Sequence, residues 1–108
     1  MTVNQLAELL NANKLNIANG EKEVATGYAG DLLSFVMGRA PEDSAWFTIM
    51  TNVNILAVAT LTDVAVVVVC EGATVDESII EKAKQQEINL IKTEYDVFNA
   101  IKRYLDET

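Results

Sequence analysis

The sequence predicts an α/β fold in which a mostly parallel central sheet carries helices on both faces, a three-layer α/β/α sandwich. Val64 to Cys70 is apolar throughout and rich in β-branched residues. A strand without polar alternation is buried on both faces, so helices must cover it above and below. Ala45 to Met50 is a second apolar strand candidate, and a helix candidate opening at Thr51-Asn52 separates the two. This order is typical of a parallel sheet, with Val64 to Cys70 as its central strand.

The N-terminal part of the chain predicts a helix followed by a tight turn. Thr2 and Gln5 form a capping-box pattern ahead of apolar residues at helical spacing. Two short strand candidates, Lys14 to Ile17 and Glu23 to Tyr28, flank Asn19-Gly20. That dipeptide readily supplies the positive φ angles of a two-residue turn, so we expect a hairpin or tight corner there.

Two of the expected helices are apolar on almost every side. The first runs from Leu32 to Met37, with Asp31 as a candidate cap and Gly38 as its stop. The second runs from Val53 to Leu61, capped by Thr51 or Asn52. A surface helix needs only one apolar stripe. We therefore expect the first helix to be sandwiched in the core or covered by another subunit.

The C-terminal part of the chain predicts two further helices around a short strand. Thr74 or Asp76 caps a helix that continues to about Gln86, and Ile88 to Ile91 forms the strand. Thr93 then caps the last helix, and Val97, Ile101, Tyr104 and Leu105 line one face of it. Right-handed crossovers place the last three strands side by side and parallel.

Size and charge narrow the classes of partner. A chain of 108 residues forms one domain, residues 1–108. Sixteen acidic and eight basic residues give a net charge of −8, which disfavours nucleic acid and anionic membrane surfaces as partners. Cys70 is the only cysteine, so we expect a reduced, buried thiol. The sequence shows no signal-peptide pattern and no apolar run of ~20 residues, and a cytoplasmic location is expected.

The most promising site lies where the parallel strands end. Strand carboxyl ends and the following helix starts meet at one edge of such a sheet, and ligands usually bind there. Backbone amides at the helix starts suit an anion or the polar edge of a nucleotide, although the same residue types also favour caps and turns without a ligand. The residues expected at this edge are Thr51, Asn52, Asn54, Glu71, Gly72, Thr93, Tyr95 and Asp96.

A glycine-containing segment is the second candidate site. Gly27 and Gly30 precede a helix start with small residues near them, a pattern that resembles an anion-holding loop. Glycine is also the usual residue wherever a turn requires positive φ, so simple turn geometry is the alternative interpretation.

The sequence lacks the residues and motifs that are typical of catalytic sites. The chain has no histidine, and its single cysteine lies in an apolar run that would raise the thiol pKa. Neither a phosphate-binding G-x-x-x-x-G-K-[ST] loop nor a G-x-G-x-x-G fingerprint is present. We therefore expect a protein that is not an enzyme and that holds no metal or cofactor.

Four strings, spread over roughly Asn19 to Tyr104, resemble the DRTGG domain family. They are Gly27-Tyr28-Ala29-Gly30-Asp31-Leu32-Leu33-Ser34, then Ile49-Met50-Thr51-Asn52 before an apolar helix, then Cys70-Glu71-Gly72, and finally Thr93-Glu94-Tyr95-Asp96-Val97-Phe98. The family tends to have Thr-Gly-Gly at the third string and Thr-Pro-Tyr-Asp-Thr-Phe at the fourth. The namesake Asp-Arg-Thr-Gly-Gly is not present, and Glu71 replaces a glycine.

The resemblance implies a non-catalytic regulatory module that is typically dimeric. The first functional hypothesis is therefore a cytoplasmic module that senses a small molecule, with a nucleotide as one candidate, at the strand ends. The second is a protein-interaction or homodimerisation module without a small-molecule ligand, which the all-round apolar helices favour. Glu71 would repel a phosphate, or it would accept hydrogen bonds from a ribose or an amine.

Overall fold

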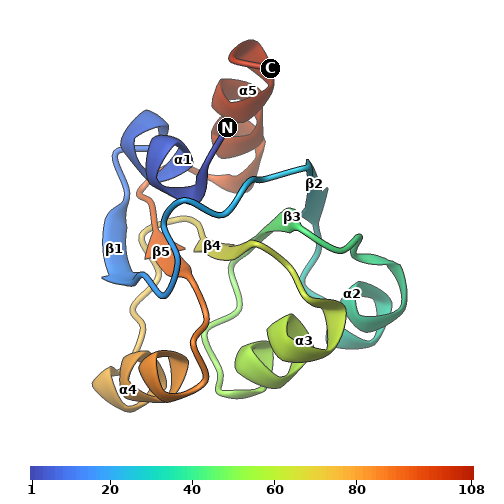
Figure 1. Ribbon diagram of the computed structural model, residues 1–108, viewed down its shortest axis with the longest axis vertical. Helices are drawn as coiled ribbons and strands as arrows, with labels where there is room; N and C mark the ends of the chain where they lie inside the picture. The colour runs from blue at the N-terminus through green and yellow to red at the C-terminus, as the bar shows by residue number, and fades with distance from the viewer.

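The computed structural model describes residues 1–108, and its five strands form one sheet in the order β1-β5-β4-β3-β2 (Figure 1). Strands β2 to β5 are parallel to one another, and β1 pairs antiparallel with β5. The expected mostly parallel α/β fold is confirmed. The strands are β1 (Asn13–Asn16), β2 (Thr26–Ala29), β3 (Ser44–Thr48), β4 (Val66–Val69) and β5 (Leu90–Lys92).

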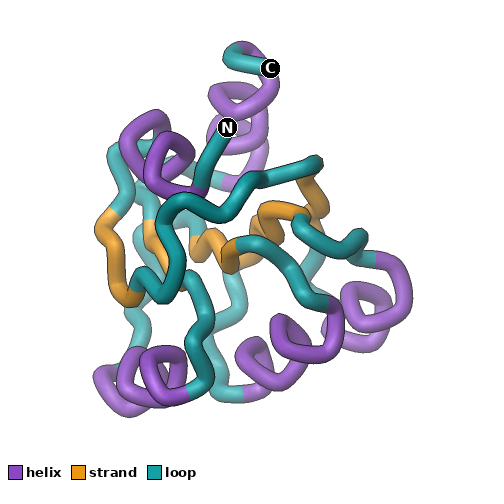
Figure 2. Tube along the Cα trace, in the orientation of Figure 1, coloured by secondary structure: helices purple, strands orange, loops and turns teal.

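Five helices cover the two faces of this sheet, so the three layers are also confirmed. Helices α1 and α5 lie on one side of the strands, and α2, α3 and α4 lie on the other (Figures 1 and 2). Each side has its own apolar cluster beneath the helices. The helices are α1 (Val3–Leu9), α2 (Leu33–Arg39), α3 (Asn54–Thr62), α4 (Glu77–Gln85) and α5 (Val97–Asp106).

Strand β4 occupies the middle of the sheet, as its uninterrupted apolar sequence predicts. Its four valines are fully buried. Val66 and Val68 belong to the cluster beneath α1 and α5, whereas Val67 and Val69 belong to the cluster beneath α2, α3 and α4. Successive side chains point to opposite faces of a strand, so a strand that feeds two cores must be apolar at every position.

The hairpin expected at Asn19-Gly20 is wrong, because β1 and β2 lie at opposite edges of the sheet. The connecting loop instead packs on α1, where the amide of Asn4 donates to the carbonyl oxygen of Gly20 at 2.9 Å. A Cβ atom on Gly20 would overlap the Asn4 side chain. The other expectation, a tight corner, is confirmed, since the amide of Lys22 donates to the carbonyl oxygen of Asn19 at 3.3 Å across Gly20. Glycine is needed here for its close approach to Asn4, and the parallel pairing of β2 with β3 determines where β2 lies.

Helix α2 is not sandwiched in the core. Val36 is its one buried residue, while Leu32 and Phe35 are 62% and 52% exposed. The expected cap at Asp31 is also wrong, because α2 has no side-chain cap and begins after Leu32. Gly38 lies inside the helix rather than ending it. The helix packs beside α3 near the edge strand β2, where no further strand covers its exposed apolar side chains.

Two other helix starts differ from the expected ones. Val53, not Thr51 or Asn52, occupies the N-cap position of α3. Asp96, not Thr93, is the N-cap of α5, since its Oδ1 accepts a hydrogen bond from the amide of Asn99 at 2.7 Å. At α4 the N-cap position is Asp76, one of the two residues expected there, although its side chain makes no capping hydrogen bond. Neighbouring Asp, Asn and Thr residues have similar cap preferences, so sequence cannot decide which of them caps a helix.

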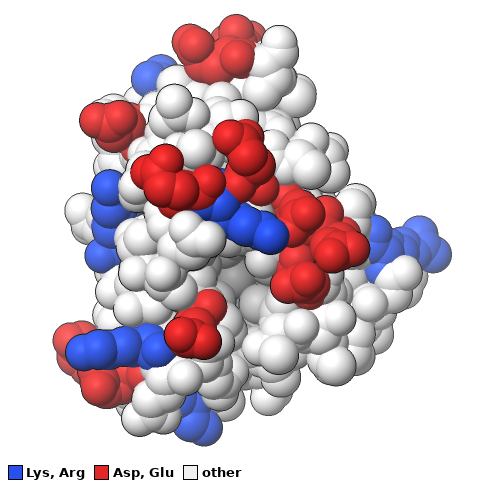
Figure 3. Space-filling view, viewed as in Figure 1, with Lys and Arg blue, Asp and Glu red and all other residues white.

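The surface is strongly acidic, as the net charge of −8 requires. Asp and Glu side chains gather around the loop between β1 and β2 and at the C-terminal end of α5 (Figure 3). None of the five helices has the length and apolar composition needed to cross a membrane.

Candidate functional site

The loops that follow β4 and β5 are joined at the carboxyl edge of the sheet. The amide of Glu71 donates to the carbonyl oxygen of Tyr95 at 2.8 Å, and the amide of Gly72 donates to that of Thr93 at 2.9 Å. Glu71 and Gly72 have φ angles of 65° and 60°. A Cβ atom on Gly72 would lie 2.6 Å from both carboxylate oxygens of Glu94. Gly72 is therefore required both by its left-handed backbone and by the close approach of Glu94.

The loop after β2 is fixed to the end of β3 by three polar contacts. Asp31 Oδ1 accepts hydrogen bonds from Thr48 Oγ1 at 2.7 Å and from the amide of Ile49 at 2.9 Å. The indole Nε1 of Trp46 donates to the carbonyl oxygen of Gly30 at 2.8 Å. These contacts hold the loop after β2 beside the loop after β3, at the same edge as the loops after β4 and β5.

Gly27 and Gly30 both have packing roles in this structure. Gly27 lies within β2, where a Cβ atom would be 3.4 Å from the ring of Phe47 and 3.5 Å from that of Tyr104. A Cβ atom on Gly30 would be 3.3 Å from the ring of Tyr28. The two glycines therefore do not form one loop around a common point.

The residues after β3 lie at the start of α3. Asn52 Oδ1 accepts a hydrogen bond from the amide of Asn54 at 2.9 Å, which places the side chain of Asn52 over the first turn of the helix. Thr51 makes no side-chain hydrogen bond. Thr51, Asn52 and Asn54 share the carboxyl edge with Glu71 and Tyr95, but they line none of the cavities in the structure.

A cavity of about 260 Å³ lies at this edge beside Tyr95 and Thr93. Its other lining residues are Leu10, Asn11 and Glu94. Thr93 is buried, and its Oγ1 donates to the carbonyl oxygen of Leu10 at 2.8 Å while accepting from the amide of Tyr95 at 3.3 Å. Asn11 Nδ2 donates to Tyr95 Oη at 3.5 Å. The C-terminal end of α1 thus forms one wall of the cavity.

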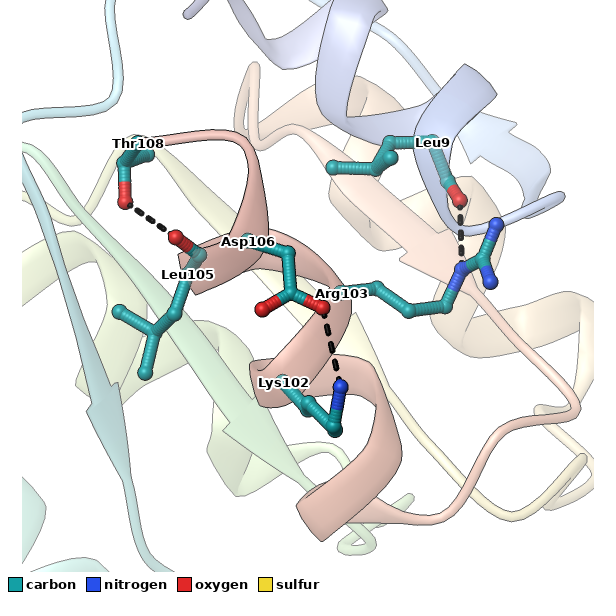
Figure 4. A network of polar contacts seen from close by, with 6 residues as sticks. All are labelled: Leu9, Lys102, Arg103, Leu105, Asp106 and Thr108. Carbon is teal, nitrogen blue, oxygen red and sulfur yellow. Dashed lines mark hydrogen bonds and ion pairs between the residues drawn. The ribbon is translucent and has the colours of Figure 1, made fainter.

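Arg103 brings a positive charge to the same place. Its guanidinium carbon lies 4.9 Å from the centroid of the Tyr95 ring. Its Nε donates to the carbonyl oxygen of Leu9 at 3.1 Å, so the side chain bridges from α5 to the last residue of α1 (Figure 4). The two terminal nitrogens make no hydrogen bond with the protein, and a planar guanidinium is well shaped for phosphate or carboxylate.

Of the residues expected at the strand ends, the structure brings Glu71, Gly72, Thr93 and Tyr95 into direct contact through the two joined loops. Asp96 caps α5, and both of its carboxylate oxygens are bonded to Asn99. Sequence reasoning missed Arg103, because no local pattern connects it to a tyrosine eight positions earlier. Only the packing of α5 beside α1 brings the two side chains together.

The pKa shifts of three groups lead away from neutral pH. Burial, aided by the charge of Glu71, raises the pKa of the Cys70 thiol to about 12. The hydrogen bonds from Asn99 lower the pKa of Asp96, and burial raises the pKa of Tyr104. Each shift moves away from neutrality, whereas general acid–base catalysis requires a pKa near the working pH. The arrangement offers hydrogen-bond donors, acceptors and one cation, which suit binding.

The fold defines a small α/β domain whose strand ends meet at one polar edge. The DRTGG domain family matches residues 42–105, more than half of the chain, and the chain belongs to this family. The family resemblance found in the sequence is thereby confirmed. No curated protein matches the sequence.

One similar solved structure is the crystal structure of the CBS and DRTGG domains of the regulatory region of Clostridium perfringens pyrophosphatase, complexed with its activator, diadenosine tetraphosphate. The TM-score is 0.74 and the sequence identity is 21%. The alignment covers 94% of this chain but 44% of that one, so this chain spans less than half of the pyrophosphatase fragment. At this identity the likeness shows the shared fold.

Proposed function

We propose that this DRTGG domain is a non-catalytic, cytoplasmic regulatory module that senses a small molecule at the carboxyl edge of its sheet. The observation that carries the proposal is the arrangement around Tyr95. Residues after β5 and at the end of α1 line a cavity of about 260 Å³, and Arg103 stacks on the ring of Tyr95, one of the lining residues. The structural neighbour, a regulatory region crystallised with a dinucleotide activator, supports a nucleotide as the first ligand to test.

The side chains at this edge suit the phosphate and the ribose of a nucleotide. The free terminal nitrogens of Arg103 would donate to a phosphate, while Glu71 and Glu94 would accept hydrogen bonds from ribose hydroxyls. Both glutamates would repel a phosphate placed next to them. Since the whole chain carries a charge of −8, Arg103 would supply a local attraction for an anion, together with backbone amides at the helix starts.

Thermal unfolding in the presence of adenine nucleotides, including diadenosine tetraphosphate, tests this proposal. A ligand at about 100 times its Kd stabilises the folded state by about 2.7 kcal/mol. A small domain should then show a rise in Tm of roughly 10 °C or more. We expect Arg103→Gln to abolish most of this rise. Arg39→Gln is the matched control, because Arg39 also lies over an aromatic ring, that of Phe35, at 4.7 Å.

Two outcomes would contradict the ligand-sensing proposal. One is the absence of any rise in Tm across nucleotides and common metabolites. The other is an equal effect of the Arg103 and Arg39 substitutions, which would mean that the ligand binds away from Tyr95. Calorimetric titration of the wild-type protein would verify that a rise in Tm reports binding to the folded state.

A second candidate function, a protein-interaction or homodimerisation module, is favoured by the exposed apolar side chains of α2 and α3. Besides Leu32 and Phe35, Leu61 is 71% exposed. An isologous dimer through these helices would bury this surface. Sedimentation velocity at micromolar concentration should then show a dimer, and Phe35→Asp should dissociate it. A wild-type monomer under these conditions would eliminate the homodimer.

A further inference from the structure

Strand β2 is an open edge of the sheet that nothing in its own sequence protects from pairing with another chain. Its residues, Thr26 to Ala29, include no charge and no proline, and they keep regular register with β3. The other edge strand, β1, carries a lysine and an irregular register with β5, which are common devices against such pairing. The amide of Ala25 donates inward, to the carbonyl oxygen of Asp43 at 2.9 Å. Because inward and outward backbone groups alternate along a strand, those of Thr26 and Tyr28 face outward.

The helices beside this edge, α2 on one face of the sheet and α5 on the other, both carry exposed apolar side chains (Figure 1). On α2 these are Leu32 and Phe35. On α5 they are Phe98, which is 76% exposed, and Leu105, which is 59% exposed. Residues three or seven positions apart lie on the same side of a helix, so each pair forms an apolar stripe. A strand edge with apolar helix surface on both faces resembles a domain core cut in half, which is typical of obligate subunit interfaces.

The largest cavity of the structure, about 670 Å³, is an apolar groove along β2 on the α5 side. Its floor includes the rings of Phe47 and Tyr104, which Gly27 leaves uncovered because it has no side chain. Ile101 and Leu105 of α5 form one wall. The apolar stripe of α5 therefore continues into the groove.

The charges around the edge do not select a charged occupant for the groove. Met1, with its α-amino group, and Glu107, with its carboxylate, both line it, so both signs of charge are present. On α2 the charges instead suit a second copy of the chain. Arg39 ends this helix, lies 4.7 Å from the centroid of the Phe35 ring, and makes no ion pair within the chain. The exposed Asp31 precedes the helix, and positions 31 and 39 are equally far from position 35.

We propose that β2 pairs antiparallel with β2 of a second copy, across a two-fold axis perpendicular to the sheet, so that two five-stranded sheets join into one. Thr26 of each copy then lies opposite Tyr28 of the other, and the two residues exchange backbone hydrogen bonds. This inference rests on the homodimer given above as the second candidate function, and it specifies β2, α2 and α5 as the interface, without α3.

The same axis packs α2 on α2 at one face and α5 on α5 at the other. Antiparallel packing of α2 about Phe35 brings each Arg39 to Asp31 of the second copy. Phe98 and Leu105 lie equally far from the middle of α5, so each meets the other residue in the second copy. The Leu105 side chains of both copies then cover the groove.

A second copy fits this edge better than a single extended segment of another protein. Such a segment would pair with β2, but the two helix stripes lie in the layers on either side of the strand and would stay exposed. A partner that covers all three layers needs a strand edge with an apolar helix on each face. This chain has that arrangement.

Sedimentation velocity at micromolar concentration tests the proposal. The salt concentration should be about 0.15 M, because each copy carries a charge of −8 and salt screens their repulsion. We expect a wild-type dimer. Phe35→Asp and Leu105→Asp, on opposite faces of the sheet, should each raise its Kd about tenfold or more. Leu61→Asp, at an exposed leucine of α3, is the matched control and should leave the Kd unchanged.

The outcomes separate this interface from homodimerisation in general. A wild-type monomer would overturn both. A dimer that Leu61→Asp or Phe35→Asp dissociates but Leu105→Asp leaves intact would keep the homodimer and overturn the pairing through β2, since α5 would then lie outside the interface.

Amide hydrogen exchange reports the strand pairing itself. The amides of Thr26 and Tyr28 should exchange about tenfold or more slowly in the wild-type dimer than in Leu105→Asp, because pairing gives both a hydrogen-bond partner. An unchanged urea midpoint for Leu105→Asp, measured at a concentration where both proteins are monomers, would show that the variant keeps its fold. Fast exchange of both amides in a wild-type dimer would overturn the proposal.

Discussion

Asn89 shows how one buried amide fixes a long connection. Its Oδ1 accepts hydrogen bonds from the amides of Ala18 and Asn19 at 2.8 and 2.9 Å, and its Nδ2 donates to the carbonyl oxygens of Asn19 and Ala65 at 2.9 Å each. The side chain thereby ties the loop after β1 to the segment before β4. The turn at Asn19-Gly20 forms, but these contacts with a residue some 70 positions away fix the loop beside β4 and β5 instead of in a hairpin.

Asn89→Ala should destabilise the protein by about 2–3 kcal/mol, because it leaves buried backbone donors and acceptors without partners. Urea unfolding would measure the change as a lower midpoint at constant slope. Asn52→Ala is the control, since Asn52 is exposed and bonds a single amide, and its loss should cost under about 1 kcal/mol. Similar costs for the two substitutions would mean that water replaces the contacts of Asn89.

At the scale of elements, the sequence predicts those features of a helix or strand that depend on its own residues. The apolar segments that became β3 and β4 were predictable, because strands buried on both faces must be apolar throughout. The pairing of β1 with β5 was not, since an edge strand with mixed side chains fits several partners. The convergence of Gly72, Thr93 and Tyr95 follows from parallel topology alone. The approach of Arg103 to Tyr95 depends on how two helices pack, which no local pattern contains.

Helix α5 should depend on pH through its cap, Asp96. The hydrogen bonds from Asn99 lower the pKa of this carboxyl group below its ordinary value of 3.8. A carboxyl group whose pKa falls on folding stabilises the protein above its unfolded pKa, and this contribution disappears as the pH falls through the folded pKa. Asp96→Asn keeps a capping oxygen but cannot titrate there.

The wild-type protein should therefore lose more stability than Asp96→Asn between about pH 6 and about pH 3. Urea midpoints for the two proteins at each pH would measure this difference. Parallel pH profiles would show that the cap bond does not depend on the charge of the carboxylate.

At the scale of the whole molecule, the sheet divides the interior into two apolar clusters. One lies beneath α1 and α5 and includes Val68 and Ile91, and the other lies beneath α2, α3 and α4 and includes Ile55. Strand β4 supplies side chains to both clusters, so the two halves share a backbone while their side chains stay apart. Core substitutions on opposite faces should therefore act independently, whereas substitutions on the same face should couple.

Double-mutant cycles test this division. Ile55→Val and Ile91→Val should each cost about 0.5–1.5 kcal/mol, since each removes one buried methyl group. Their combination should be additive within about 0.5 kcal/mol, because the two side chains lie in different clusters. Val68→Ala with Ile91→Val is the matched pair within one cluster, where the residues are direct neighbours on β4 and β5. This pair should depart from additivity by about 0.5 kcal/mol or more. If the pair across the sheet couples as strongly as the pair within one cluster, the sheet transmits packing changes between its faces. Ligand binding at the shared strand ends would then change the packing of both layers of helices.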